Sequence, residues 1–174
     1  MMSPTPLRLL AVLALGVSLL SGCTPAPEST PTPSPAFTSE EEAFVAAEAT
    51  YRAYNDAGNS RRNGAGGDPS KYLIGAALDA DRAAAEDLSA NGLRVVGTVE
   101  VTAFTGISTA FSDDVVTVEA VVCLDTSDNK LLNEQGQDVS AVDRATAIAS
   151  RIRLVTVSGS FYIEDEQATE ADEC

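Results

Sequence analysis

The sequence contains no histidine and no tryptophan, and only three of its 174 residues are cysteine. Without an imidazole, every catalytic triad, proton relay and metal site that depends on histidine is excluded. Three cysteines are also too few for a structural zinc site or an iron–sulfur cluster. We therefore expect neither a metal site nor a cofactor.

Positive charge is scarce as well. The chain has 11 lysines and arginines against 26 aspartates and glutamates, which gives a formal net charge of −15. A nucleic-acid backbone would be repelled by such a chain rather than neutralised, so nucleic acid is not expected as a partner. The length suits one domain, and two would be cramped.

The first 22 residues have the composition of an export signal. One basic residue, Arg8, precedes an apolar run over residues 9–20 that only one glycine and one serine interrupt. A helix needs about 20 apolar residues to cross a hydrocarbon core, so this run is too short to span one. It has the length of a signal-peptide core, although a short retained anchor remains an open alternative.

The four residues that end this segment, Leu20-Ser21-Gly22-Cys23, resemble the lipobox of bacterial lipoproteins. The resemblance implies that residues 1–22 are a lipoprotein signal peptide and that the Cys23 thiol receives lipid. Two or three acyl chains at one terminus make a stable anchor. We therefore expect membrane attachment through Cys23, on the extracytoplasmic face of the cell membrane.

Residues 23–37 form the lipidated cysteine and a proline-rich tether. Residues 24–37 hold five of the eight prolines, and beyond them only Pro69 remains. Such a segment cannot build a core and favours extended conformers. At roughly 3 Å per residue, the tether can hold a domain up to about 40 Å from the membrane. A single domain over residues 38–174 is predicted.

Two helices are predicted at the start of this domain. Two overlapping capping boxes, Thr38 with Glu41 and Ser39 with Glu42, start the first, and Gly58-Asn59 ends it. Asp68-Pro69 starts the second helix, and Asn91-Gly92 ends it. The residues expected to face the core are Phe44, Ala47, Tyr51 and Tyr54 in the first helix, and Leu73, Ala77, Ala80, Ala84 and Leu88 in the second.

After residue 92 the apolar period changes to two, which predicts strands over residues 94–104, 115–125, 145–157 and 161–165. Residues 126–138 are predicted as a loop or long hairpin tip. Along the second strand, one face is formed by Val116, Val118, Ala120, Val122 and Leu124. Arg151 and Arg153 alternate on one face of the third strand, where Glu100 or Glu119 is the expected partner across the sheet.

This order predicts an α+β fold, with two N-terminal helices packed on a curved antiparallel sheet of about four strands. Over residues 38–166 it resembles the cone-shaped nuclear transport factor 2-like domain, also called ketosteroid-isomerase-like, although other helix-on-sheet arrangements stay open. The resemblance implies a pocket between helix and sheet. The candidate pocket residues are Tyr51, Tyr54 and Tyr72, with Asp79 or Asp81 as the carboxylate; alternatively, the tyrosines are core residues whose hydroxyls reach the surface.

The cysteine count predicts one cross-link. With Cys23 as the lipid acceptor, Cys123 and Cys174 remain, and an oxidising compartment would join them in a disulfide. That bond would pin the acidic tail, residues 164–173, back over the sheet.

Two other motifs resemble binding loops but lack a residue that such a loop needs. Asp125, Ser127 and Asn129 are followed by Lys130 where a calcium loop needs glycine, so a solvated acidic surface is favoured over calcium. Arg61-Arg62 and the glycines that follow lack the ending of a phosphate loop, and a flexible connection is predicted.

The leading hypothesis is a non-catalytic lipoprotein whose domain binds an envelope protein or a small ligand. The alternatives are an enzyme or carrier that uses an apolar pocket, and a subunit of an export or conjugation apparatus. The sequence leaves the oligomeric state undetermined.

Overall fold

The computed structural model describes residues 37–170 and residue 174, which belong to the unit Ser34–Cys174. The predicted signal peptide, the lipidation residue Cys23 and most of the predicted tether lie outside the described residues. They therefore stay predictions from the sequence.

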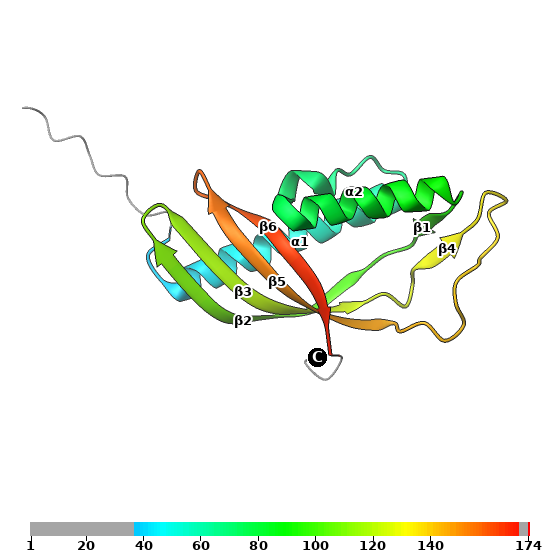
Figure 1. Cartoon of the computed structure of the whole chain (residues 1–174). Coiled ribbons are helices and arrows are strands. Elements are labelled where there is room, and N and C mark those ends of the chain that lie inside the picture. The colour runs from blue at the N-terminus through cyan, green and yellow to red at the C-terminus, as the bar shows by residue number, and fades with distance from the viewer. Residues whose placement is uncertain (1–36, 171–173) are drawn as a thin grey trace, which may run out of the picture. The chain divides into compact units, whose positions relative to one another are not determined.

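The described residues form two α-helices, one 3-10 turn and six strands (Figure 1). A four-stranded antiparallel sheet has the order β2-β3-β5-β6, and β1 and β4 form a separate antiparallel pair. The predicted α+β class, with two helices packed on an antiparallel sheet, is confirmed. The elements are α1 Glu40–Arg62, η1 Pro69–Tyr72, α2 Gly75–Ala90, β1 Arg94–Val96, β2 Glu100–Ser112, β3 Val115–Asp125, β4 Lys130–Leu132, β5 Ala147–Val157 and β6 Ser160–Thr169.

Helix α1 begins at the second of the two predicted capping boxes. Ser39 is the N-cap, and its Oγ accepts a hydrogen bond from the Glu42 backbone N–H at 3.1 Å. The Glu42 carboxylate reaches one residue further back, where it accepts from the Thr38 N–H and hydroxyl. The prediction that the helix ends at Gly58-Asn59 is wrong, because α1 continues to Arg62 with Gly58 buried inside it.

The core lies between α1 and the four-stranded sheet. Helix α1 contributes mainly small side chains, Ala43 and Ala47, together with Tyr51, and these are buried. The predicted inward face of β3 is confirmed, since its valines and alanine are buried and Leu124 packs against the cluster. Tight contact through alanine brings the α1 backbone close to the sheet, so its longer polar side chains reach the strand backbone.

The predicted second helix divides into two elements. Asp68 caps a 3-10 turn, where its carboxylate accepts from the Ser70 N–H, and α2 starts only at Gly75. Along α2 only Ala77 is buried, whereas Ala80 and Ala84 are exposed and Leu88 is half-buried. The predicted buried face is therefore wrong beyond Ala77. The reason is that α2 packs on β6 and then extends past the four-stranded sheet (Figure 1).

The single strand predicted over residues 94–104 is also divided. Gly97, at φ +97°, turns the chain between β1 and β2, and a Cβ there would lie 2.3 Å from the Asp128 carbonyl oxygen. Strand β1 leaves the main sheet and pairs with β4, which lies within the segment predicted as a loop. Glycine is required at this position for both its positive φ and its close backbone contact.

Three asparagines, two in α1 and one at its C-cap, replace the missing strand partner at this break. Asn59 forms two hydrogen bonds with the Val99 backbone: its Nδ2 donates to the carbonyl at 3.0 Å and its Oδ1 accepts from the N–H at 2.8 Å. Asn55 donates to the same carbonyl at 2.8 Å, and Asn63 exchanges two longer bonds with Gly97. Spacings of four residues place these asparagines on one helix face, and we call them the asparagine ladder.

Strand β6 changes the interpretation of the acidic tail. The residues from Glu164 to Thr169 are not laid back over the sheet, because they continue β6 as its edge strand. The register skips Glu164, since Leu154 pairs with Ile163 and Arg153 pairs with Asp165. This bulge shifts the alternation by one residue, so Glu166 faces the helices.

The predicted arginine partners on the sheet need a similar correction. Glu119 lies opposite Arg153 in the register, but the Arg153 guanidinium forms its ion pair with Glu164, at 2.8 Å. Arg151 lies opposite Val121 rather than an acid. The bulge explains the first difference, because it places the Glu164 carboxylate on the outer face beside Arg153.

The asparagine ladder predicts a localised loss of stability. Asn59→Ala removes the acceptor of the part-buried Val99 N–H and one of the two donors to its carbonyl, which should lower the free energy of unfolding by about 1–3 kcal/mol. Urea denaturation of the purified domain measures this. Asp56→Ala, an exposed change on the same helix, is the control and should have little effect. Equal losses in the two variants would contradict the role of the ladder.

Candidate functional site

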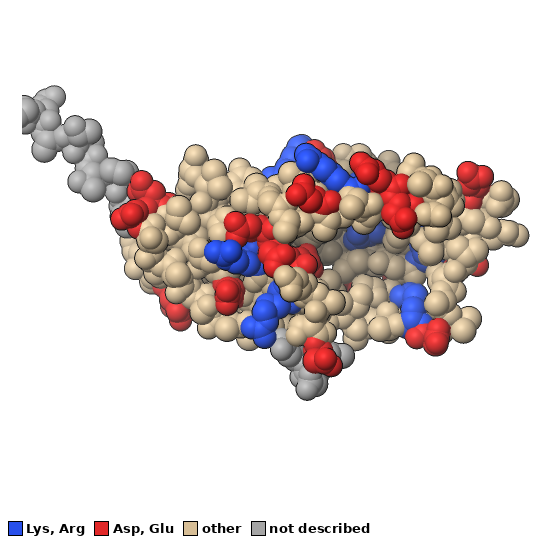
Figure 2. Space-filling view, viewed as in Figure 1, with Lys and Arg blue, Asp and Glu red and all other residues tan. Residues whose placement is uncertain are grey.

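An open groove of about 820 Å³ lies between the C-terminal end of α1, the second half of α2 and strand β1. Figure 2 shows the surface hollowed below the helices, with basic atoms inside the hollow. This volume is within the range of small-molecule sites. The lining residues are Arg61, Arg62, Asn63, Gly64, Asp81, Ala84, Ala85, Leu88, Ser89, Leu93, Arg94, Val95 and Val96.

The groove follows from the two departures from the predicted fold. The alanines of α2 that were expected in the core line the groove instead, and their small side chains leave it open. The turn at Gly97 carries β1 away from the main sheet to form the facing wall. The asparagine ladder holds that turn against α1. The groove is therefore open because the α2 side chains are small and because β1 turns away from the main sheet at Gly97.

One arginine of the groove is neutralised. Arg61 donates two hydrogen bonds to the Asp81 carboxylate, at 3.0 and 2.6 Å. These hydrogen bonds raise the pKa of Arg61 above its ordinary value, with the Asp81 charge adding to the effect. Asp81 was predicted as a candidate carboxylate for a tyrosine, but the structure pairs it with this guanidinium.

Arg62 is held differently. Its guanidinium donates to the Asn59 Oδ1, while its Nε is buried and has no acceptor among the described residues. Gly58 leaves the room for this side chain, because a Cβ there would lie 3.3 Å from the Arg62 Nη1. Burial lowers the pKa of Arg62, and no carboxylate of the described residues forms an ion pair with it. Among the described residues, no carboxylate therefore compensates its positive charge.

Arg94 adds a second uncompensated charge. It is an exposed residue of β1, and neither a hydrogen bond nor an ion pair joins its side chain to the other described residues. The lining thus combines three arginines with one aspartate, in a chain whose formal net charge is −15. A concave region of this sign attracts anions locally although the whole molecule repels them.

The predicted pocket tyrosines are only partly brought together. The rings of Tyr51 and Tyr54 lie 5.6 Å apart on α1, whereas Tyr72 lines a separate cavity of about 390 Å³ beside Phe37 and Phe161. Neither Tyr51 nor Tyr54 lines the groove. The acid that meets Tyr51 is Glu166 rather than Asp79 or Asp81.

Tyr51 and Glu166 form a buried pair between α1 and β6. Tyr51 is 1% exposed, and its hydroxyl donates to the Glu166 Oε1 at 2.9 Å. Burial raises the pKa of Glu166, although hydrogen bonds from Tyr51 and Ser150 oppose the effect. Burial and the nearby Glu166 charge raise the pKa of Tyr51, and the same two causes raise that of Tyr54 to about 12. The pair therefore satisfies buried polar groups, and Tyr51 is a core residue.

The Glu166 pKa gives a pH dependence of stability. Because the folded pKa is raised, the native state holds more protons than the unfolded state between the two pKa values, so stability falls as pH rises through that window. Glu166→Gln removes this term and keeps an acceptor for Tyr51. The variant should gain thermal stability relative to wild type as pH rises from 4 to 8. A stability difference that does not change with pH would contradict this assignment.

Tyr51→Phe tests the same pair from the other side. It removes one of the two donors of the buried carboxylate and leaves Ser150 as the other, and the free energy of unfolding should fall by about 1–3 kcal/mol. Tyr72→Phe is the matched control and should change stability little, since no hydrogen bond of the Tyr72 hydroxyl is found among the described residues.

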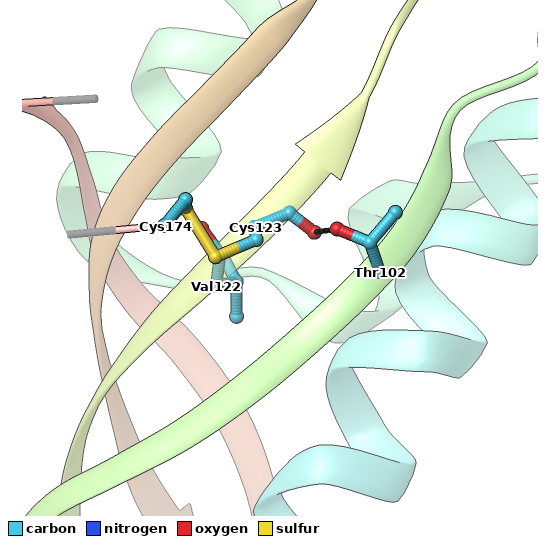
Figure 3. Close-up of a disulfide and its surroundings, with 4 residues drawn as sticks. All are labelled: Thr102, Val122, Cys123 and Cys174. Atoms are coloured by element: carbon cyan, nitrogen blue, oxygen red, sulfur yellow. Dashed lines mark hydrogen bonds between the residues drawn. A yellow bond between two sulfur atoms is a disulfide. The ribbon is translucent and has the colours of Figure 1, made fainter. Parts of the chain in front are cut away.

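The predicted disulfide is present in the structure. Cys123 of β3 and Cys174 are joined, with their Cα atoms 5.7 Å apart (Figure 3). Beside it the Thr102 hydroxyl donates to the Cys123 carbonyl at 3.1 Å, at a bulge where β2 leaves Thr102 out of register. Cys123 lies on the sheet face opposite the helices, so the cross-link fastens the chain end to the outer face.

Removing this cross-link should destabilise the domain. Cys123→Ser with Cys174→Ser opens a loop of 51 residues, which should cost about 4 kcal/mol of unfolding free energy on the chain-entropy model. Guanidinium denaturation with and without reductant measures the effect. Reduced wild type should match the double variant, and Cys23→Ser should leave unfolding unchanged.

With this geometry, the domain can be classed as α+β with two helices on an antiparallel sheet. No protein-family model matches the sequence, and no curated protein matches it. Among solved structures, the chain is similar to the crystal structure of the intermembrane space region of chloroplast protein ARC6, at 15% identity and a TM-score of 0.53. The match covers 72% of this chain and 95% of that one. At this identity the likeness shows the fold alone.

None of the helices described in residues 37–170 is both long and apolar enough to cross a membrane.

Proposed function

We propose that the chain is a lipoprotein anchored to the extracytoplasmic face of the cell membrane, and that its domain binds a small ligand without catalysis. The observation that carries the binding role is the groove between α2 and β1, with Arg62 and Arg94 uncompensated in its lining. Arginines held in this way supply fixed donors for an anionic group.

The proposed compartment is supported by the cysteine chemistry. Disulfides persist in oxidising, extracytoplasmic environments. The Cys123–Cys174 bond uses two of the three cysteines of the chain and leaves Cys23, in the lipobox-like Leu20-Ser21-Gly22-Cys23, as the third. A lipid acceptor must be a free thiol, so the pairing agrees with lipid attachment at Cys23.

A binding role is favoured over catalysis by the way the acids are used. In the groove lining that the structure describes, the Asp81 carboxylate is occupied by Arg61. The sequence predicted a tyrosine beside an aspartate as the group for proton transfer. The pair that the structure forms instead, Tyr51 with Glu166, is buried and does not line the groove. General acid–base catalysis needs such groups within reach of a substrate.

Lipid attachment predicts a strict dependence on Cys23. Wild type expressed in a bacterial host should incorporate labelled palmitate, lose residues 1–22 and partition into detergent, because acyl chains hold it in the membrane. Cys23→Ser should lose the label and stay unprocessed. The Cys123→Ser, Cys174→Ser double variant is the control and should still be labelled. Palmitate label and processing that survive in Cys23→Ser would overturn the proposed anchor.

A further inference from the structure

The groove contains two kinds of surface that one ligand would have to satisfy together. The cationic part consists of Arg62 and Arg94, and the apolar part consists of side chains of α2 and of the segment around β1. A small inorganic anion would leave the apolar side uncovered. A neutral apolar molecule would cover the arginines and further desolvate their charge, which is costly.

Arg62 and Arg94 have N–H donors that no other described residue accepts from. A guanidinium has five N–H donors. Arg62 gives one hydrogen bond, to Asn59, and Arg94 gives none to the other described residues. Asn59 is also a member of the asparagine ladder, so Arg62 is positioned by the same side chain that holds the wall of the groove. Planar guanidinium groups match carboxylate and phosphate oxygens in bidentate geometry.

The apolar side of the groove is made by residues of two facing elements. Helix α2 contributes Ala84, Ala85 and Leu88, and the facing wall contributes Leu93, Val95 and Val96. Leu88 and Val95 are half-buried, so hydrocarbon is available to a ligand without any change of the core.

We propose that this groove binds an amphipathic organic anion, with a carboxylate or phosphate head on Arg62 and Arg94 and an apolar body between α2 and β1. The inference rests on the proposed binding role and names the class of ligand. It does not depend on the lipid anchor. The chain from residue 23 with Cys23→Ser is suited to the test, since the unit Ser34–Cys174 holds the whole described core and the disulfide.

Isothermal titration of this chain with octyl phosphate, decanoate, inorganic phosphate and decyltrimethylammonium distinguishes the contribution of the charged head to affinity from that of the apolar body. Octyl phosphate should bind at least about tenfold more tightly than inorganic phosphate, because buried methylene groups add affinity. Decanoate should bind as well, since both heads suit arginine, and the cation should not bind. Binding of the cation as tight as that of the anions, or no binding of either amphipathic anion, would overturn the proposal.

Variants locate the binding. Arg94→Gln and Arg62→Gln should each weaken octyl phosphate about tenfold or more, as expected for a lost charge-assisted hydrogen bond. Arg82→Gln, an exposed arginine of α2 outside the groove lining, is the matched control and should stay within about twofold of wild type. The Arg94 side chain forms no hydrogen bond or ion pair with the other described residues, so its variant remains informative if Arg62→Gln does not fold. Equal losses in Arg94→Gln and Arg82→Gln would overturn the assignment.

Leu88→Gln completes the design. It should weaken the binding of octyl phosphate severalfold and leave the binding of inorganic phosphate unchanged, because only the apolar body contacts α2 at this position.

The proposal of a lipid anchor and the proposal of a ligand class can fail independently of each other. If lipid labelling depends on Cys23 but the groove does not bind the anions, only the ligand class is wrong. If the groove binds the anions but labelling does not need Cys23, only the anchor is wrong.

Discussion

The asparagine ladder of α1 is the constraint on which the rest of the site depends. Strand β1 leaves the main sheet at Gly97, and a chain that leaves a sheet loses hydrogen-bond partners. Asn55, Asn59 and Asn63 supply them from one helix face. The ladder fixes the distance between α1 and the break, and so it sets the position of the facing wall. It also holds the Arg62 guanidinium through Asn59.

Much of the fold could be predicted because its signals are local and periodic. The inward face of β3 follows from strict alternation, and the cross-link follows from the cysteine count. The break at Gly97 could not be predicted, since residues around it keep a strand-like composition. The buried face of α2 was wrong for a related reason: alanine suits both a close helix contact and an exposed helix surface. Only the length of the sheet beneath α2 decides between them.

The site was less predictable than the fold. Tyr51 was singled out by its helical spacing, but its partner Glu166 depends on a bulge at Glu164 that no sequence period reveals. Arg62 was assigned to a flexible connection because the helix was expected to end before it. The signal that could have found the groove is the spacing of the three asparagines, which extends the helical period to the C-cap Asn63 and predicts a polar partner along that face.

The pair of short strands has its own mechanical consequence. Hydrogen bonds from the ladder and from Arg144, which donates to three loop carbonyls, fasten β1 and β4 to the rest of the domain. Few buried apolar contacts are involved, so this element belongs to the low-stability end of the molecule, where local opening precedes global unfolding. A ligand bound against β1 would slow amide exchange in this strand first, because its binding would make local opening of the β1–β4 pair less frequent.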